Sequence, residues 1–127
     1  MKNVILIDDD EISNFVNTRL FLQSKLVDTV HSIQSSEEAI EYFGDIHSGK
    51  EPAPYLVLID IRMPVLDGFD LMGEIFGRYP GLGEKSLFYF LSSSIDPKDV
   101  ARANSEDFCK GFLRKPLSRS ILEEILG

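Results

Sequence analysis

The sequence has little cysteine, no tryptophan and no long apolar run, and the first and last of these shortages exclude classes of protein. Its one cysteine, Cys109, can form neither an internal disulfide nor a cysteine-rich zinc site. No apolar run approaches the roughly 20 residues that a membrane helix needs. The apolar segment at the start of the chain ends at Asp8, so it is too short for the apolar region of a signal peptide. We therefore expect a cytoplasmic protein that does not bind a membrane.

Basic residues are also in short supply. The chain has 13 Lys and Arg against 21 Asp and Glu, which gives a formal charge of −8. Since binding to nucleic acid or to an anionic membrane needs a surplus of cations, both are excluded as general partners. What is present is a globular balance of 43% hydrophobic and 27% charged residues. The length predicts one domain, residues 1–127, with a real core.

Strand and helix patterns alternate five times along the chain. Apolar segments predict strands at 4–7, 27–33, 55–59, 87–91 and 111–113. Helical spacing predicts helices at about 11–24, around 39–43, around 71–76, from Asp96-Pro97 to about Glu106 or Asp107, and around 121–126. The first helix is inferred from Ile12, Phe15, Val16 and Leu20. Five βα units in succession predict an α/β fold, a doubly wound, five-stranded parallel sheet of the flavodoxin type.

Chemically active side chains stand where these strands end: Asp8 and Asp9, Asp60, Ser92, and Lys115. In open α/β sheets the ligand site lies beyond the carboxyl ends of the strands. Carboxylates at a partly open site suit Mg²⁺, and a carboxylate nucleophile can form an acyl phosphate. Ser92 and Lys115 are the right groups to donate to phosphoryl oxygens. A cis Lys115-Pro116 bond would aim the lysine inward.

These motifs resemble the receiver domains of two-component response regulators, chemotaxis-regulator-like proteins among them, over essentially the whole chain. The resemblance rests on Ile5-Leu6-Ile7-Asp8-Asp9, Leu58-Ile59-Asp60-Ile61-Arg62-Met63-Pro64, Asp67-Gly68, Leu91-Ser92-Ser93 and Phe112-Leu113-Arg114-Lys115-Pro116. An acidic pair, Asp-x-x-Met-Pro-x-x-Asp-Gly and a late Lys-Pro, in this order, form a specific combination.

The resemblance implies a role for each site residue. Asp60 would accept a phosphoryl group from a histidine kinase or histidine phosphotransfer protein. Asp9 and Asp60 would bind Mg²⁺ directly and Asp8 through water, with the backbone carbonyl of Arg62 as a further ligand. Lys115 would hold a phosphoryl oxygen, Ser92 would be the switch hydroxyl, and Phe112 would be the aromatic that moves with it.

The sequence departs from the family pattern at several places, and three of them concern residues of the site. Three serines in a row leave Ser93 as an alternative switch hydroxyl. Phe112 lacks the hydroxyl of tyrosine, so any switch would be steric. Arg62 places a long cation beside Asp60, where it could screen the attacking water or pair with the acids; the sequence leaves both open.

We expect a stand-alone signalling switch, not an enzyme, which passes its output to a downstream protein and exists as a monomer or weak dimer. No output domain is predicted. One alternative is a phosphatase of the haloacid-dehalogenase type, with Asp8 as nucleophile and Asp10 as acid/base. It leaves Asp60 and the Met63-Pro64 turn unexplained. The other is a receiver-shaped adaptor that needs no phosphate, which would leave a costly carboxylate cluster unused.

Overall fold

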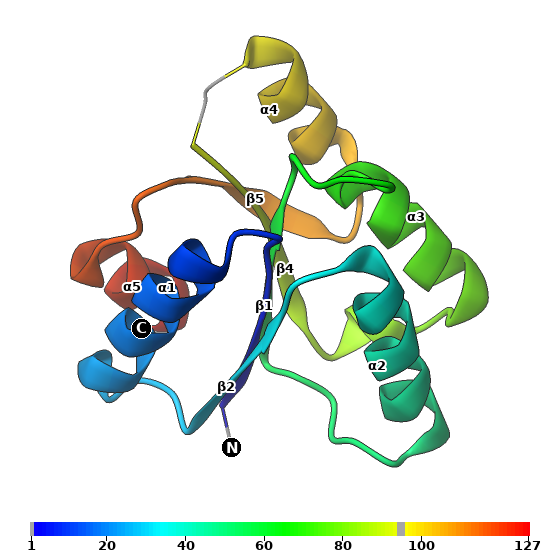
Figure 1. Ribbon diagram of the computed structural model, residues 1–127, viewed down its shortest axis with the longest axis horizontal. Coiled ribbons are helices and arrows are strands. Elements are labelled where there is room, and N and C mark those ends of the chain that lie inside the picture. The colour runs from blue at the N-terminus through cyan, green and yellow to red at the C-terminus, as the bar shows by residue number, and fades with distance from the viewer. Residues whose placement is uncertain (1, 94–95) are drawn as a thin grey trace.

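The structure is a computed structural model that describes residues 2–93 and 96–127; Ser94, the third of the serines after the fourth apolar run, lies outside them. Strands and helices alternate along the chain (Figure 1). In order, they are β1 (Asn3–Ile7), α1 (Glu11–Ser24), β2 (Thr29–Ile33), α2 (Ser36–Ser48), β3 (Leu56–Asp60), α3 (Gly68–Arg78), the short 3₁₀ turn η1 (Leu82–Glu84), β4 (Leu87–Ser92), α4 (Pro97–Ser105), β5 (Cys109–Arg114) and α5 (Arg119–Leu126).

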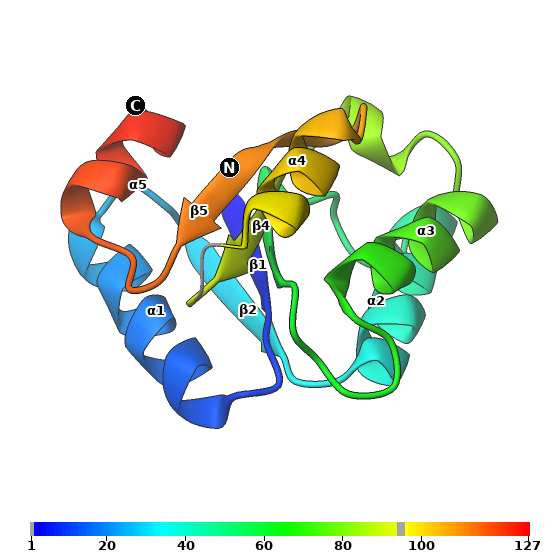
Figure 2. The ribbon, with the colours of Figure 1, turned by 90° about the horizontal axis from the view of Figure 1, so that it is seen from above.

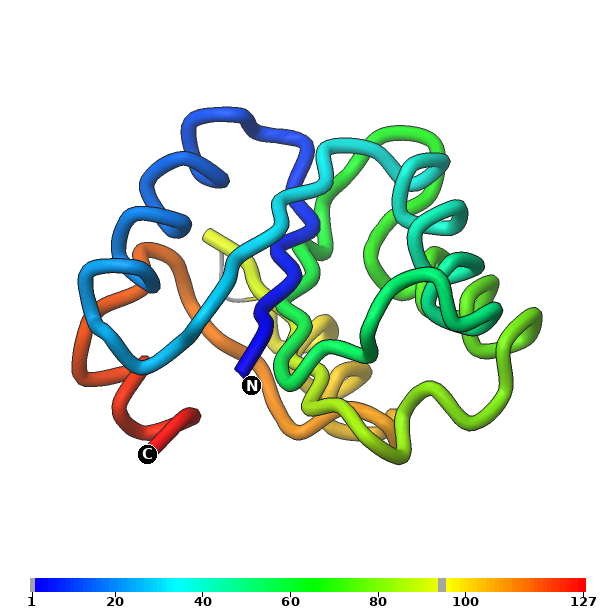
Figure 3. The backbone as a smooth tube through the Cα atoms, turned by 90° about the horizontal axis from the view of Figure 1, so that it is seen from below, coloured from blue at the N-terminus to red at the C-terminus, as the bar shows by residue number. Residues whose placement is uncertain are grey.

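All five strands are parallel and lie in the order β2-β1-β3-β4-β5. Seen from below, β2 lies at the edge of the sheet beside β1 (Figure 3). This is the doubly wound, flavodoxin-like arrangement predicted from the alternation of patterns, and that prediction is confirmed.

Two layers of helices cover the sheet (Figures 1 and 2). On one face α1 and α5 bring Phe21, Leu122 and Leu126 against inward side chains of β1 and β3. On the other face α2, α3 and α4 pack against the opposite side chains of β1, β3 and β4. Because β1 and β3 are covered on both sides, their sequences read as continuous apolar runs. No helix in the described part of the chain is long and apolar enough to cross a membrane.

The first helix has the predicted bounds, but of the four residues from which it was inferred only Leu20 packs against the core. Ile12, Phe15 and Val16 are 73%, 61% and 52% exposed. The buried side chains of α1 are Asn14, Asn17, Phe21 and Ser24. The physical reason is position: the first turns of α1 pass the carboxyl ends of β1 and β2, where backbone carbonyls need donors that asparagine supplies and apolar side chains do not.

The bounds of β2, β5 and α4 differ from those predicted, and the ends of β1, β3 and β4 differ by one residue. β2 begins at Thr29 and not Val27, because its pairing with β1 starts only at Asn3. β5 is longer than 111–113, since an irregular register near Phe88 allows Cys109 to pair as well. α4 ends at Ser105, because the backbone of Glu106 turns extended.

Candidate functional site

Three carboxylates meet at the carboxyl edge of the sheet, as the sequence predicted. Asp8 follows β1, and Asp60 is the last residue of the neighbouring strand β3. With Asp9, they offer oxygen atoms that all lie within 4.8 Å of one another. Asp8 and Asp60 are buried, at 2% and 6% exposure, whereas Asp9 is exposed. The cluster therefore consists of two buried carboxylates, Asp8 and Asp60, and one exposed carboxylate, Asp9.

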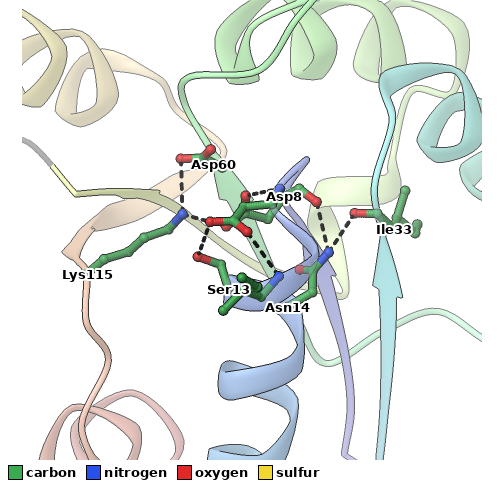
Figure 4. A network of polar contacts seen from close by, with 8 residues as sticks. Asp8, Ser13, Asn14, Ile33, Asp60 and Lys115 are labelled. Carbon is green, nitrogen blue, oxygen red and sulfur yellow. Dashed lines mark hydrogen bonds and ion pairs between the residues drawn. The ribbon is translucent and has the colours of Figure 1, made fainter.

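Lys115 brings a cation to this cluster from the end of β5. Its Nζ lies 2.5 Å from a carboxylate oxygen of Asp8 and 3.7 Å from one of Asp60 (Figure 4). The backbone N–H of Lys115 donates to the carbonyl of Ser92 at 2.8 Å, which joins the ends of β4 and β5. The Lys115-Pro116 peptide bond is cis.

One lysine does not neutralise the three acids. The pKa of Asp60 is raised to about 6, first by burial and then by the negative charge of Asp8. Lys115 and a backbone hydrogen bond from Arg62 lower it, but not enough to cancel burial. A cluster of oxygen ligands with surplus negative charge is what a hard divalent cation prefers, so these residues fit a metal ion.

The turn between β1 and α1 is held by hydrogen bonds at several points. The Asp10 carboxylate caps α1 by accepting from the N–H of Ile12 at 3.0 Å, and the N–H of Asp10 donates to the Asp8 carboxylate at 2.9 Å. The side chain of Asn14 donates to the carbonyl of Asp8 at 2.8 Å. Asp10 therefore serves as a helix cap outside the cluster, and nothing in its contacts supports the acid/base role that the phosphatase alternative gives it.

The loop after β3 folds back closely onto Asp60. The N–H of Gly68 donates to the carbonyl of Ile61 at 2.9 Å. A Cβ atom at Gly68 would lie only 2.6 Å from the carbonyl oxygen of Asp60, so glycine is required at this approach. At the tip of the loop Val65 is 95% exposed and has a φ of 71°, a strained conformation for a β-branched residue.

The ion pairs of Arg62 bear on one of the two roles that the sequence left open for it, pairing with the acids of the cluster. Its guanidinium lies 2.5 Å from the Asp99 carboxylate and 4.0 Å from that of Asp96, both at the start of α4. Since the ion pairs found for Arg62 in the described residues are these two, its side chain bridges the loop after β3 to α4 and is not paired with the three carboxylates of the cluster.

The two predicted switch residues lie on neighbouring strands. Ser92 ends β4 and is 1% exposed, whereas Ser93 is exposed. Phe112 is half-buried in β5, opposite Phe90 of β4, and packs against the core on the side of α2, α3 and α4. The structure thus places Ser92, and not Ser93, toward the interior.

Sequence reasoning missed Asn14 and the acids that pair with Arg62. The sequence did hold a signal for Asn14: positions 14, 17, 21 and 24 also lie at helical spacing, on the face opposite Ile12, Phe15 and Val16. For Asp96 and Asp99 the sequence held no signal, because both lie far from Arg62 along the chain; Asp99 is 37 residues away.

Comparisons with known proteins agree with this geometry. A model of the response regulator receiver domain matches residues 4–126. The chain is 33% identical to the two-component response regulator ORR41 of Oryza sativa subsp. japonica, over all of this chain and 93% of the relative. It spans about half the length of other curated relatives that it matches.

Solved structures give the same family and fold. A two-component response regulator from Cytophaga hutchinsonii is 32% identical, with a TM-score of 0.91 over 98% of this chain and 93% of that one. A CheY in complex with CheX, BeF₃ and Mg²⁺ from Borrelia burgdorferi shares the fold at 21% identity, with a TM-score of 0.77 over 97% of this chain and 84% of that one.

Proposed function

Because the chain belongs to the response regulator receiver family, we propose that Asp60 is the residue on which it carries a phosphoryl group. Members of this family signal through phosphoaspartate in two-component systems, and the chain is a signalling phosphoacceptor, not a true enzyme. The observation that carries the assignment is the position of Asp60. It is the buried carboxylate that ends the central strand β3, with Asp8, Asp9 and Lys115 beside it.

The arrangement suits phosphoryl transfer from a phosphohistidine. An oxygen of Asp60 attacks phosphorus, the bond from phosphorus to the donor nitrogen breaks, and the imidazole keeps the electron pair. The new phosphoryl oxygens need donors, and the Lys115 ammonium, 3.7 Å from Asp60, is within reach of them. The Ser92 hydroxyl, at the end of the neighbouring strand, is our candidate for the switch contact, with Phe112 as the aromatic that follows it.

Mg²⁺ is the cation that we propose for the cluster. Asp9 and Asp60 would bind it directly and Asp8 through water, with the backbone carbonyl of Arg62 as a further ligand. Three carboxylates with oxygens within 4.8 Å of one another support this choice. When bound, the ion would neutralise charge on the incoming phosphoryl group.

The phosphodonor, a histidine kinase or a histidine phosphotransfer protein, must rest on the rim of this site. Within the described residues, the exposed large apolar side chains are Ile12, Phe15, Val16 and Leu22 of α1, and Val65 in the loop after β3. We call the four on α1 the apolar stripe. Ile12 and Phe15 lie in the first turns after the acidic pair, and Val65 lies in the loop that follows Asp60. These exposed apolar side chains favour a donor with an apolar contact face. That the signal passes to a further protein stays a prediction.

A small-molecule donor tests the assignment without any partner. The protein is incubated with acetyl phosphate and Mg²⁺, and intact mass is measured. We expect a gain of one phosphoryl group that is lost in Asp60→Asn and kept in Asp28→Asn, a matched change on the far side of the molecule. An adduct that depends on Asp8 as nucleophile would favour the phosphatase, and no adduct under any condition would favour the adaptor.

A further inference from the structure

Asn14 lies on the buried face of α1, 3% exposed, and its amide is aimed at the ends of two strands. Nδ2 donates to the carbonyl oxygen of Asp8 at 2.8 Å and to that of Ile33 at 3.4 Å (Figure 4). The N–H of Asp8 donates to the same Ile33 carbonyl at 3.0 Å. The side chain therefore ties β1 to β2 at the point where β1 turns toward α1.

We propose that Asn14 is a positioning residue for the cation site: it fixes the backbone of Asp8 and Asp9 so that their carboxylates converge on Asp60. This inference rests on the proposed function, since it takes the three carboxylates to hold a divalent cation. Asn14 itself touches no cation; it acts through the backbone of Asp8.

The other atom of the same amide supports this role. Oδ1 of Asn14 is buried and has no hydrogen-bond partner among the described residues. An unpaired buried acceptor costs free energy, and an apolar side chain of similar size would avoid that cost. A side chain that carries this cost while its nitrogen holds two carbonyls is better explained by what it positions than by what it adds to stability.

The acidic pair needs such support. Asp9 is exposed, so core packing does not fix its carboxylate, and its direction follows from the backbone on either side. On the far side, Asp10 is held by its cap on the N–H of Ile12. On the near side, Asn14 holds the carbonyl of Asp8. Groups that orient metal ligands in this way typically change metal affinity by about 10–100-fold when removed.

Asn14→Leu and Asn17→Leu make a matched pair for the test. Both residues lie on the buried face of the same helix, at 3% and 6% exposure. They differ in that Asn14 is the one whose side chain donates hydrogen bonds to the carbonyls of Asp8 and Ile33. Leucine keeps the volume and removes the donor. The dissociation constant for Mg²⁺ is measured by calorimetry on the unphosphorylated protein. Urea unfolding of the same variants shows whether each one folds and how stable it is. We expect Asn14→Leu to weaken Mg²⁺ binding by about tenfold or more, and Asn17→Leu to leave it near the wild-type value.

Two results would overturn the inference: Asn14→Leu that binds Mg²⁺ as the wild type does, or equal weakening in both variants, which would mean a general loosening of α1. Asn14→Ala is read in the same way if the leucine variant does not fold. Asp9→Asn separates this failure from failure of the cation site. If Asp9→Asn binds Mg²⁺ normally, the proposed site is wrong and the role of Asn14 falls with it. If it loses binding while Asn14→Leu does not, only the role of Asn14 is wrong.

Discussion

The ammonium of Lys115 lies 2.5 Å from Asp8 and 3.7 Å from Asp60, so it pairs more closely with Asp8 than with the proposed phosphoacceptor. The side chains of Lys115 and Asp8 are only 16% and 3% exposed. In such a buried pair, removal of one partner leaves the other charge without compensation. Lys115 therefore stabilises the metal-free site, and it lies close enough to Asp60 to contact a phosphoryl group there.

Lys115→Met should lower the free energy of unfolding by about 3 kcal/mol at neutral pH without metal, because Asp8 and Asp60 lose their shared cation. Urea unfolding measures the change. Lys85→Met, at an exposed lysine, should stay within about 0.5 kcal/mol of the wild type. Millimolar Mg²⁺ should recover part of the loss, since a ligand of the native state stabilises it. Equal stability of the two variants would show that the pair with Asp8 contributes nothing.

The raised pKa of Asp60 predicts a pH-dependent effect of Asp60→Asn. The native carboxyl holds its proton up to a pKa of about 6, against 3.8 ordinarily. Its ionisation therefore destabilises the native state as pH rises from about 4 to 6 and remains costly above that range. Without metal, Asp60→Asn should be more stable than the wild type at pH 8, by up to about 3 kcal/mol.

The difference between Asp60→Asn and the wild type should shrink below pH 4, where the carboxyl is neutral in both the native and the unfolded state. Urea unfolding at several pH values without metal gives the profile. A difference that is constant from pH 4 to 8 would mean that burial of the charge is not the cause. Saturating Mg²⁺ should reduce the difference at pH 8, because the ion favours the charged carboxylate.

Most of the fold could be predicted from the sequence because a parallel sheet covered on both faces leaves a strong local signal. The runs at 4–7, 55–59 and 87–91 are apolar without alternation, and the residues after them bear the chemistry. Topology then brings Asp8, Asp60 and Lys115 to one edge, since parallel strands end on the same side.

Two features could not be predicted from the sequence, the orientation of α1 and the partner of Arg62, because both depend on contacts between distant segments. The helical spacing of Ile12, Phe15, Val16 and Leu20 was visible in the sequence, but that spacing does not say which face of the helix meets the sheet. That choice is made by the carbonyls of Asp8 and Ile33, which need the donor of Asn14. In the same way, the partner of Arg62 became visible only when α4 was in place.

Truncation of Phe21 should lower the stability of the protein far more than truncation of Phe15, although both residues lie on α1. Phe21 is fully buried against the sheet, whereas Phe15 is 61% exposed. Phe21→Ala should cost about 3–5 kcal/mol, since it opens a cavity, whereas Phe15→Ser should stay within about 0.5 kcal/mol of the wild type. Urea unfolding separates them. A large loss for Phe15→Ser would mean that the stripe is part of the core after all.

Phe15→Ser also bears on the donor. It should phosphorylate normally with acetyl phosphate, which needs no docking surface, and more slowly with a phosphohistidine protein that can phosphorylate the wild type. If the rate with such a protein is unchanged, the apolar stripe is not the surface on which that donor rests.

Gly68 approaches Asp60 so closely that a larger residue at position 68 should disturb the site. A Cβ at Gly68 would lie 2.6 Å from the Asp60 carbonyl oxygen and 3.1 Å from Cα of Ile61, and both are backbone atoms that cannot rotate away. Gly68→Ala should therefore lower stability by about 1–3 kcal/mol and weaken Mg²⁺ binding, because β3 must shift at the carboxylate. Gly73→Ala is the control: on the same helix, its Cβ would meet nothing within 4 Å, and alanine there should stabilise by up to about 1 kcal/mol. Urea unfolding and Mg²⁺ calorimetry measure both effects, and a Gly68→Ala variant that matches Gly73→Ala in both would show that the loop can move without disturbing Asp60.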